Sequence, residues 1–331
     1  MDVIAIGEVL IDFTPYGVSE QGQPLYERNP GGAPANVLAA LAKLGKRTAF
    51  IGAVGDDAFG AYLSDTLREA DINIDQLKHS KEALTTLAFV HLDESGDRSF
   101  TFYRRPGADQ FLRAEEIDRV AAASAKLLHF GSVSMTDEPA RSATLETAAY
   151  ARSQGVMISY DPNLRLPLWK DEASARTVIL EGMRLADISK LSEEELLFLT
   201  GTDDLDKGSS MLMESFNQLQ LLFITLGPHG SYCKLRTTGD GQAPYQSARS
   251  AGYSVTVVDT TGSGDAFLGG ALYCILDSRS PLGKEWTTSK LERMLAFANA
   301  MGAITATGKG AIPSLPSSAE QVRAFVAQRH A

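Results

Sequence analysis

Cysteine is scarce in this chain, and long apolar runs are missing. The 331 residues include only two cysteines, Cys233 and Cys274, with neither CxxC nor Cys/His spacing, so the sequence predicts neither a disulfide framework nor a zinc site. No stretch of eighteen uninterrupted apolar residues occurs, which argues against a membrane partner. The chain starts without a basic segment and a small-residue cleavage site, so we expect a cytoplasmic location.

Positive charge is also in deficit. Lys and Arg number 31 against 41 Asp and Glu, giving a formal net charge of -10. Nucleic-acid binding needs a basic face that displaces counterions from phosphates, so we expect no nucleic-acid partner. A single nucleotide remains compatible with this charge, because a few local cations and backbone N–H groups suffice to hold one anion.

Short apolar runs alternate with stretches of helical spacing, which predicts βαβ units and a mostly parallel sheet. Helices are expected over 34–44, where apolar residues recur on one stripe, and over 58–70. The predicted strands are Val3 to Gly7, Ala49 to Val54, Lys126 to Phe130, Gly155 to Tyr160, Ala186 to Ser189 and Leu221 to Leu226.

Two stretches break this alternation. One runs from Asp12 to Asn29, and the other, from Thr85 to Arg105, has two β-like runs around a turn-like segment and predicts a hairpin. A small accessory sheet over one edge of the main sheet would accommodate these strands. We therefore expect one α/β domain over residues 1–331, with lid segments at about 12–30 and 85–105; Gly239 to Pro244 is expected to be a surface turn.

The motif DTTGSGDAF, Asp259 to Phe267, carries the strongest chemical signal. It lies between the β-like Ser254 to Val258 and the helix-like Leu268 to Leu276. A glycine-rich turn at a helix N-terminus lets backbone N–H groups approach a phosphate. Asp265 would then lie where it can orient an alcohol and accept its proton. The alternative is that Asp265 only caps the helix and the glycines only form the turn.

A second motif, NPGGAPAN from Asn29 to Asn36, immediately precedes the first predicted helix. Its paired glycines allow close approach to a ligand, and Asn36 offers both a donor and an acceptor to a polyol. Asp12, at a predicted strand end, could accept from sugar hydroxyls. A tight loop and an ordinary strand-end carboxylate are the alternatives. The P-loop pattern GxxxxGK[ST] is absent, and the first βα unit lacks a dinucleotide fingerprint.

Together, GGAPAN and DTTGSGD closely resemble the two signatures of the ribokinase-like sugar kinases, also called the PfkB family. The likeness extends over nearly the whole chain and is most similar in detail to the bacterial fructokinase branch. It implies a three-layer α/β fold with a central mostly parallel sheet and a small β-sheet lid, MgATP as phosphoryl donor, and a homodimer formed through the lids. Further matching segments, in family order, are Gly7 to Phe13, Phe102 to Arg104, Asp161 to Arg165, Thr225 to Gly230 and Gly310 to Pro313.

The resemblance also implies residue roles. Asp265 corresponds to the catalytic base, and the N–H groups of Gly262, Ser263 and Gly264 correspond to the anion hole. Arg104, on the lid hairpin, matches a position that reaches the substrate, with a solvated strand-end arginine as the alternative; for Arg165 the alternative is a salt bridge beside Asp161. The residues implied to bind the sugar are Asp12, Gly32, Asn36, Phe102, Arg104 and Arg165.

On the nucleotide side, the resemblance implies contacts from Lys190, Thr225, Gly227, Gly230 and Asn299. Many relatives carry Asn-x-x-Glu where this chain has Ser192 to Glu195, which implies a magnesium contact of Glu195 through water. A solvated acidic run is the competing account of this segment.

Relatives often bind a monovalent cation, such as potassium, beside the anion hole. The corresponding groups here are Asp259, Thr261 and carbonyls of residues 308–314.

The expected function is ATP-dependent phosphorylation of a sugar hydroxyl, with D-fructose giving fructose 6-phosphate. One alternative is a 2-keto-3-deoxygluconate kinase, whose substrate carboxylate could use Arg104 or Arg165. The other is a non-catalytic sugar-binding protein of the same fold. Retention of Gly262, Gly264 and Asp265 favours catalysis over binding alone.

Overall fold

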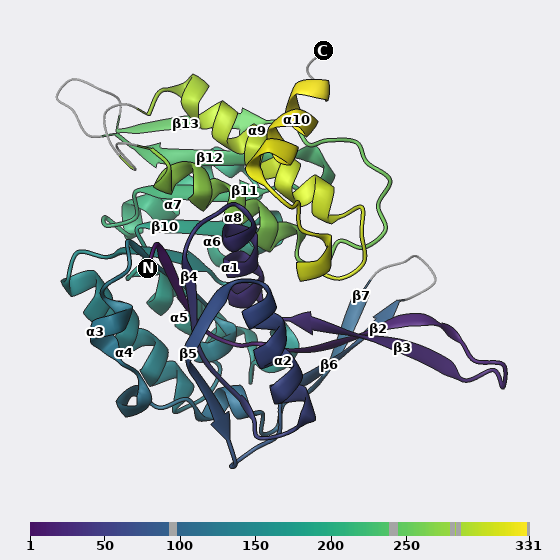
Figure 1. Ribbon diagram of the computed structural model, residues 1–331. Helices are drawn as coiled ribbons and strands as arrows, with labels where there is room; N and C mark the ends of the chain where they lie inside the picture. The colour runs from purple at the N-terminus through teal and green to yellow at the C-terminus, as the bar shows by residue number, and fades with distance from the viewer. Residues whose placement is uncertain (93–97, 238–243, 279–281, 283–285, 330–331) are drawn as a thin grey trace.

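The computed structural model describes residues 1–92, 98–237, 244–278, 282 and 286–329 (Figure 1). Its strands are β1 Val3–Ile6, β2 Leu10–Val18, β3 Pro24–Gly31, β4 Thr48–Gly55, β5 Ile72–Ser80, β6 Leu87–Leu92, β7 Arg98–Tyr103, β8 Leu127–Gly131, β9 Met157–Asp161, β10 Ile188–Ser192, β11 Leu221–Thr225, β12 Ser231–Arg236 and β13 Tyr245–Ser250. Its α-helices are α1 Ala33–Lys43, α2 Ala58–Glu69, α3 Arg119–Ala122, α4 Ala140–Ser153, α5 Glu172–Met183, α6 Glu193–Thr200, α7 Leu205–Ser215, α8 Ser263–Leu276, α9 Thr288–Thr305 and α10 Ala319–Arg329.

Nine strands form the main sheet in the order β13-β12-β11-β10-β9-β8-β1-β4-β5. Neighbouring strands run parallel from β11 to β5, and β12 alone is antiparallel to both of its neighbours. All six strands predicted from apolar runs lie in this sheet, so the expected α/β class with a mostly parallel sheet is confirmed.

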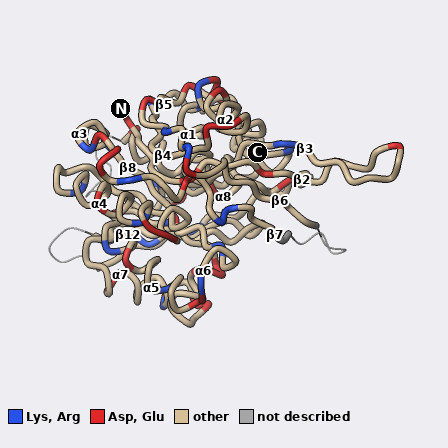
Figure 2. Tube along the Cα trace, turned by 90° about the horizontal axis from the view of Figure 1, so that it is seen from below, with Lys and Arg blue, Asp and Glu red and all other residues tan. Residues whose placement is uncertain are grey.

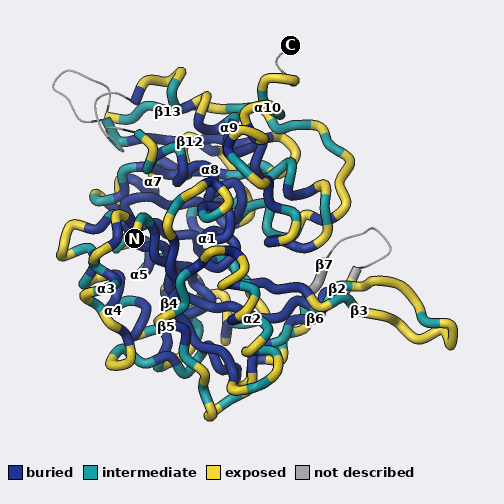
Figure 3. The backbone as a smooth tube through the Cα atoms, viewed as in Figure 1, coloured by how far each residue is buried: buried dark blue, intermediate teal, exposed yellow. Residues whose placement is uncertain are grey.

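Helices cover both faces of the main sheet, giving three layers. Alternate residues of a central strand enter different cores: Leu221 and Phe223 of β11 join one, while Leu222 and Ile224 join the other. The first core is closed by α1, α2, α8, α9 and α10, and the second by α3 to α7. Figure 3 shows these buried segments along the centre of the molecule.

The first two predicted helices are confirmed as α1 and α2. Pro34 lies in the first turn of α1, where its missing N–H has no intrahelical partner to lose. Asp57 caps α2, because its carboxylate accepts from the N–H groups of Phe59 and Gly60.

A second sheet, in the order β3-β2-β6-β7, projects from one side of the main body (Figures 1 and 2). The hairpin predicted within Thr85 to Arg105 is confirmed as β6 and β7, although its turn lies outside the described residues. The other irregular stretch, Asp12 to Asn29, lies in β2 and β3, whose inner ends are buried and whose outer ends are exposed. The pairing is mixed, since β2 runs parallel to β6 and antiparallel to β3.

The expectation of a strand at Ser254 to Val258 is wrong. The segment has no strand pairing, and Val257 and Val258 are 58% and 53% exposed. Its β-branched residues fit a pleated surface, but propensity cannot create a neighbouring edge to pair with. Of the expected surface turn Gly239 to Pro244, only Pro244 belongs to the described residues.

Within the described part of the chain, none of the helices has the length and apolar character needed to cross a bilayer.

Candidate active site

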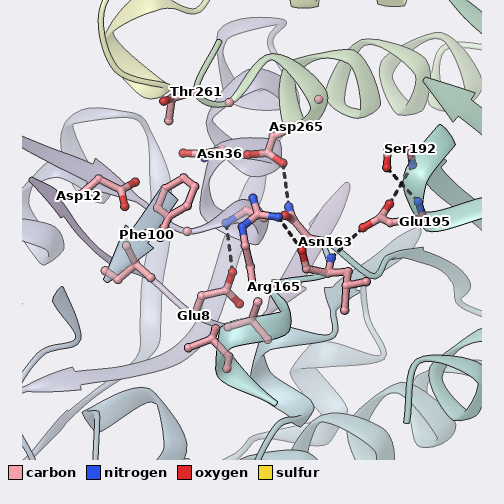
Figure 4. Close-up of a pocket in the computed structure, with 18 of the residues that line it drawn as sticks. Glu8, Asp12, Asn36, Phe100, Asn163, Arg165, Ser192, Glu195, Thr261 and Asp265 are labelled. Carbon is pink, nitrogen blue, oxygen red and sulfur yellow. Dashed lines mark hydrogen bonds between the residues drawn. The ribbon is translucent and has the colours of Figure 1, made fainter. Parts of the chain in front are cut away.

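A cavity of about 510 Å³ opens where the second sheet meets the carboxyl ends of the central strands (Figure 4). It draws its lining from segments far apart in the sequence. Ligands of open α/β sheets bind at this edge. Among the predicted site residues, those that line the cavity are Asp12, Gly32, Asn36, Phe102, Arg165, Lys190, Glu195, Thr225, Thr261, Gly262, Gly264 and Asp265.

Asp265 lies in the first turn of α8 and is 7% exposed. Asn36 Nδ2 donates to its Oδ2 at 2.8 Å, and Asn163 Nδ2 donates to its Oδ1 at 3.3 Å. Burial raises the pKa of Asp265, while the Asn36 hydrogen bond and the Lys190 charge oppose that rise. The carboxylate is therefore oriented by two amides and faces the cavity, as a general base must.

The turn before α8 depends on glycine. Gly262 is the N-cap with φ +77°, and a Cβ there would lie 2.4 Å from Ala311 Cβ. Gly264 would place a Cβ 3.3 Å from Lys190 Nζ. The Ser263 N–H already donates to the Thr260 carbonyl at 3.1 Å, so it would have to change partner to contact an anion.

Lys190, on β10, places a buried cation beneath this turn. Its Nζ lies 3.0 Å from Asp161 Oδ2, and its side chain is 8% exposed. Burial alone would lower the pKa of Lys190, but the charges of Asp161 and Glu195 outweigh burial and raise it. The alternative account of Arg165 is wrong: Asp161 pairs with Lys190, while Arg165 lines the cavity and lies 5.8 Å from the centre of the Phe100 ring.

The cavity wall at the second sheet combines a carboxylate with close backbone. Asp12, on β2, is 9% exposed, and a Cβ on Gly31 would lie 2.1 Å from Asp12 Oδ2. Gly32 has φ +112°, and a Cβ there would lie 2.5 Å from the Glu8 carbonyl oxygen. Phe102 stacks with Phe100 at a centroid distance of 5.9 Å. An acidic acceptor beside an aromatic surface suits a polyol.

The structure does not bring Arg104 to the cavity. This residue follows β7 and is 3% exposed, so the alternative of a solvated strand end is wrong. Its Nε donates to Asp109 Oδ2 at 2.8 Å, and its terminal nitrogens donate to Thr136 Oγ1 at 2.7 Å and to the Val133 carbonyl at 2.9 Å. Sequence reasoning missed Asp109, the partner that holds the guanidinium inside the protein.

Glu195 is 7% exposed, so a solvated acidic run does not describe it. It forms a capping box with Ser192: Glu195 Oε2 accepts from the Ser192 N–H at 2.8 Å, and Ser192 Oγ accepts from the Glu195 N–H at 3.2 Å. Glu195 Oε1 accepts from the Leu164 N–H at 2.7 Å. The carboxylate thus joins the start of α6 to the loop after β9.

Of the residues predicted to contact the nucleotide, Lys190 and Thr225 line the cavity, whereas Gly227, Gly230 and Asn299 lie outside its lining. Thr225 is at the end of β11. A Cβ on Gly230 would lie 2.1 Å from the Ser250 carbonyl oxygen, and Asn299 Nδ2 donates to the same oxygen at 3.2 Å and to the Ala251 carbonyl at 3.1 Å. Gly230 and Asn299 therefore fix the segment after β13. Gly227, with φ +53°, begins the turn before Gly230.

Asp259 ties the DTTGSGD motif to the chain near its C-terminal end. Its Oδ1 accepts from the Thr261 N–H at 2.8 Å, and its Oδ2 accepts from the Gly310 N–H at 2.9 Å. Asp259 as a whole is 8% exposed. Oxygen-rich groups of this kind suit a hard cation.

The cavity residues without a predicted role include Glu8, Phe100 and Asn163. Asn163 adopts φ +51°, a backbone conformation that Asn tolerates better than most residues. Both Glu8 and Asn163 lie within segments quoted for the family resemblance, so their positions were visible in the sequence. Their contacts were not, because those depend on how distant segments meet.

The comparison with family models agrees with this geometry. The model described as pfkB family carbohydrate kinase matches residues 1–318. The chain belongs to this family. It is therefore a carbohydrate kinase, a phosphotransferase. This pfkB-family kinase is 43% identical over 321 residues to the fructokinase of Solanum tuberosum. The aligned region covers 96% of this chain and 93% of that protein.

Solved structures extend the similarity to bacteria. The fructokinase of Xylella fastidiosa with bound ATP has a TM-score of 0.86 and 32% identity, covering 99% of each chain. The fructokinase of Vibrio cholerae, bound to fructose, ADP and a calcium ion, has a TM-score of 0.84 and 34% identity, covering 98% of this chain and 99% of that one. A double mutant of the latter holds fructose, ADP and a potassium ion. The expected ribokinase-like fold is confirmed.

Proposed function

We propose that this kinase transfers the γ-phosphoryl group of ATP to D-fructose, giving fructose 6-phosphate and ADP. The observation that carries the proposal is the pairing of Asn36 with Asp265 at 2.8 Å inside a cavity that also contains Asp12. The fructokinases among its relatives support fructose as the acceptor.

In this reaction Asp265 orients the fructose hydroxyl and accepts its proton. The hydroxyl oxygen forms a bond to the γ-phosphorus as the bond to the leaving oxygen of ADP breaks. N–H groups of Gly262, Ser263 and Gly264 would stabilise the transferring phosphoryl, with Ser263 first releasing the Thr260 carbonyl. The Lys190 ammonium lies under the same turn and would neutralise phosphate charge.

The sugar would be held by Asp12, Gly32, Asn36, Phe102 and Arg165, all of which line the cavity. Arg104 would serve the sugar only indirectly, because Asp109, Thr136 and Val133 already occupy its guanidinium. Arg165 is accordingly the arginine that could bind the carboxylate of 2-keto-3-deoxygluconate, the second candidate substrate.

ATP would bind along Lys190, Thr225 and Gly227, with Gly230 and Asn299 shaping the adjacent segment after β13. A magnesium ion held near Glu195 would supply positive charge to neutralise the phosphates of ATP. Glu195 suits a contact through water, since both of its oxygens already accept from backbone N–H groups. Full activity in EDTA would contradict the magnesium requirement.

A potassium ion would lie beside Asp259 and the Thr261 carbonyl, with carbonyls from residues 308–314. The Asp259 contact with Gly310 brings these two segments together. Activity in potassium compared with tetramethylammonium salts tests this site.

The second sheet is proposed to act as a lid on a single kinase domain over residues 1–331. The exposed apolar side chains of this sheet include Tyr16 at 61%, Val18 at 68% and Tyr103 at 62%, and they support a homodimer formed through the lids. Light scattering measures the oligomeric state.

The lid is proposed to close only when sugar is bound. ATP hydrolysis in the absence of sugar should then be slow, because the site is incomplete until the lid closes. The cytoplasmic location also stays a prediction.

The deciding experiment is a coupled ADP-release assay with fructose, 2-keto-3-deoxygluconate, ribose and adenosine. We expect fructose to give the highest kcat/KM. A preference for 2-keto-3-deoxygluconate would favour the second candidate. Binding of sugar without ADP release on any of the four would instead indicate the non-catalytic protein.

A further inference from the structure

Glu8, in the connection between β1 and β2, contributes a buried carboxylate to the wall of the cavity (Figure 4). The residue is 3% exposed. Its Oε1 accepts from the Ala33 N–H at the start of α1, at 3.2 Å. Its Oε2 is buried and has no hydrogen-bond partner among the described residues. The two oxygens of one carboxylate therefore have different surroundings.

The buried position of Glu8 disfavours the ionised form of its carboxyl group. Burial raises the pKa of Glu8 to about 7, Asp109 adds to the rise, and Arg104 opposes it. Arg104 and Asp109 face Glu8 from behind the cavity wall, while Asp12, Arg165 and Asp265 share the cavity with it. A buried polar atom without a partner destabilises the protein, so such atoms call for a specific explanation.

The contact with the start of α1 accounts for only one of the two carboxylate oxygens of Glu8. Oε1 alone supplies the Ala33 contact, and a glutamine would supply it equally well. Glu8, which carries the unpartnered Oε2, lines a cavity that also presents Asp12 and Asn36, two residues suited to hydroxyls. A sugar hydroxyl is a donor of the right chemistry for this atom.

We propose that Glu8 is a specificity-determining residue whose Oε2 accepts a hydrogen bond from a hydroxyl of the bound sugar. The proposal rests on the proposed function and deepens it. An ionised acceptor discriminates strongly, because a substrate lacking the hydroxyl leaves the buried charge unpaired. Glu8 does not take part in proton transfer; Asp265 does.

The variant Glu8→Gln tests this. Its carbonyl oxygen can keep the Ala33 contact while an NH2 donor replaces the Oε2 acceptor. We expect KM for fructose to rise about 10- to 100-fold, the range for a hydrogen bond to a charged group, with a smaller change in kcat. The melting temperature and ATP affinity should stay near those of the wild type. Glu214→Gln, at an exposed position on α7, is the matched control.

A pH series gives a second readout. Ionised Glu8 accepts and protonated Glu8 does not, so the wild-type KM for fructose should rise as pH falls through about 7. The part of that rise due to Glu8 should be missing in Glu8→Gln.

Fructose analogues that each lack one hydroxyl, such as 1-deoxy-D-fructose and 2,5-anhydro-D-mannitol, then identify the hydroxyl that donates to Glu8. The analogue that lacks this hydroxyl should bind wild type weakly, and Glu8→Gln should not weaken its binding further.

An unchanged KM and pH profile in Glu8→Gln, with wild type phosphorylating fructose normally, overturns the role of Glu8 and leaves the proposed function intact. If wild type uses another sugar of the panel, the same measurements are made with that sugar. If wild type phosphorylates none of them, the proposed function and the role of Glu8 both fall.

Discussion

Asn36 donates its amide N–H to Oδ2 of Asp265 at 2.8 Å, although the two residues are 229 positions apart in the chain. The contact joins the first turn of α1 to the first turn of α8. It brings the GGAPAN and DTTGSGD motifs into one site, and both amides that reach Asp265 favour its ionised form.

Asp265→Asn keeps the size of the side chain but removes the proton acceptor. We expect kcat to fall by about 10²- to 10⁴-fold, with ATP affinity nearly unchanged. Steady-state kinetics and calorimetric ATP binding measure the two quantities, and a thermal melt checks the fold. Near-normal turnover would show that another group accepts the proton.

Asn36→Ala should shift the pH dependence of kcat. Asp265 must be ionised to accept a proton, so activity falls as pH drops through its pKa. The Asn36 hydrogen bond lowers that pKa, and its removal should move the acid limb to higher pH. We expect kcat on that limb to drop about tenfold or more. Asn163→Ala, which removes a longer contact of 3.3 Å, should shift the limb less. An unmoved limb in both variants would refute this account of Asp265.

Arg104→Ala should destabilise the protein, because it leaves Asp109 buried without its cation. The side chains of this pair are 2% and 1% exposed, and removing one partner of a buried pair costs about 3–5 kcal/mol. Urea unfolding measures the loss. Arg113→Ala is the control, since its bridge to Glu82 is exposed to solvent and screened, and its loss should change stability little. Equal stability of the two variants, together with a large loss of fructose affinity in Arg104→Ala, would instead favour a direct substrate contact.

Two glycine substitutions should separate folding from catalysis. In Gly262→Ala the new methyl meets Ala311 in a strained backbone conformation, which should cost about 1–3 kcal/mol and abolish the turn. In Gly264→Ala the methyl meets only the end of the Lys190 side chain, with Nζ at 3.3 Å, so we expect near-normal stability but reduced kcat. Denaturation and kinetics on both variants test the contrast. A stable, fully active Gly262→Ala would contradict it.

Much of the fold follows from local patterns. Buried strands such as β11 are continuous apolar runs, and α1 is marked by Pro34 and its apolar stripe, so both could be found without any tertiary information. The segment Ser254 to Val258 has the same local character and forms no strand. Whether a β-prone segment pairs depends on a free sheet edge, which its own residues do not encode.

In the candidate site, too, some features follow from local sequence and others depend on tertiary contacts. The two glycine motifs predict where backbone must approach a ligand, and Gly262 and Gly32 indeed have positive φ. The position of Arg104 could not be predicted, since its partners, Asp109 and the pair of Thr136 and the Val133 carbonyl, come from two further segments. Glu8 was missed for the same reason: only the assembled cavity reveals one satisfied and one unsatisfied oxygen.

The long separation between Asn36 and Asp265 has a consequence during synthesis. The N-terminal half of the site leaves the ribosome first, whereas Asp265 is made 229 residues after Asn36, and the Gly310 partner of Asp259 is made later still. No nascent chain shorter than about residue 310 can present the paired amide and carboxylate together with the closed turn that Asp259 stabilises. Phosphotransfer competence therefore arises only after residue 310 has been made, and truncations that remove residues 259–310 should yield no partially active enzyme.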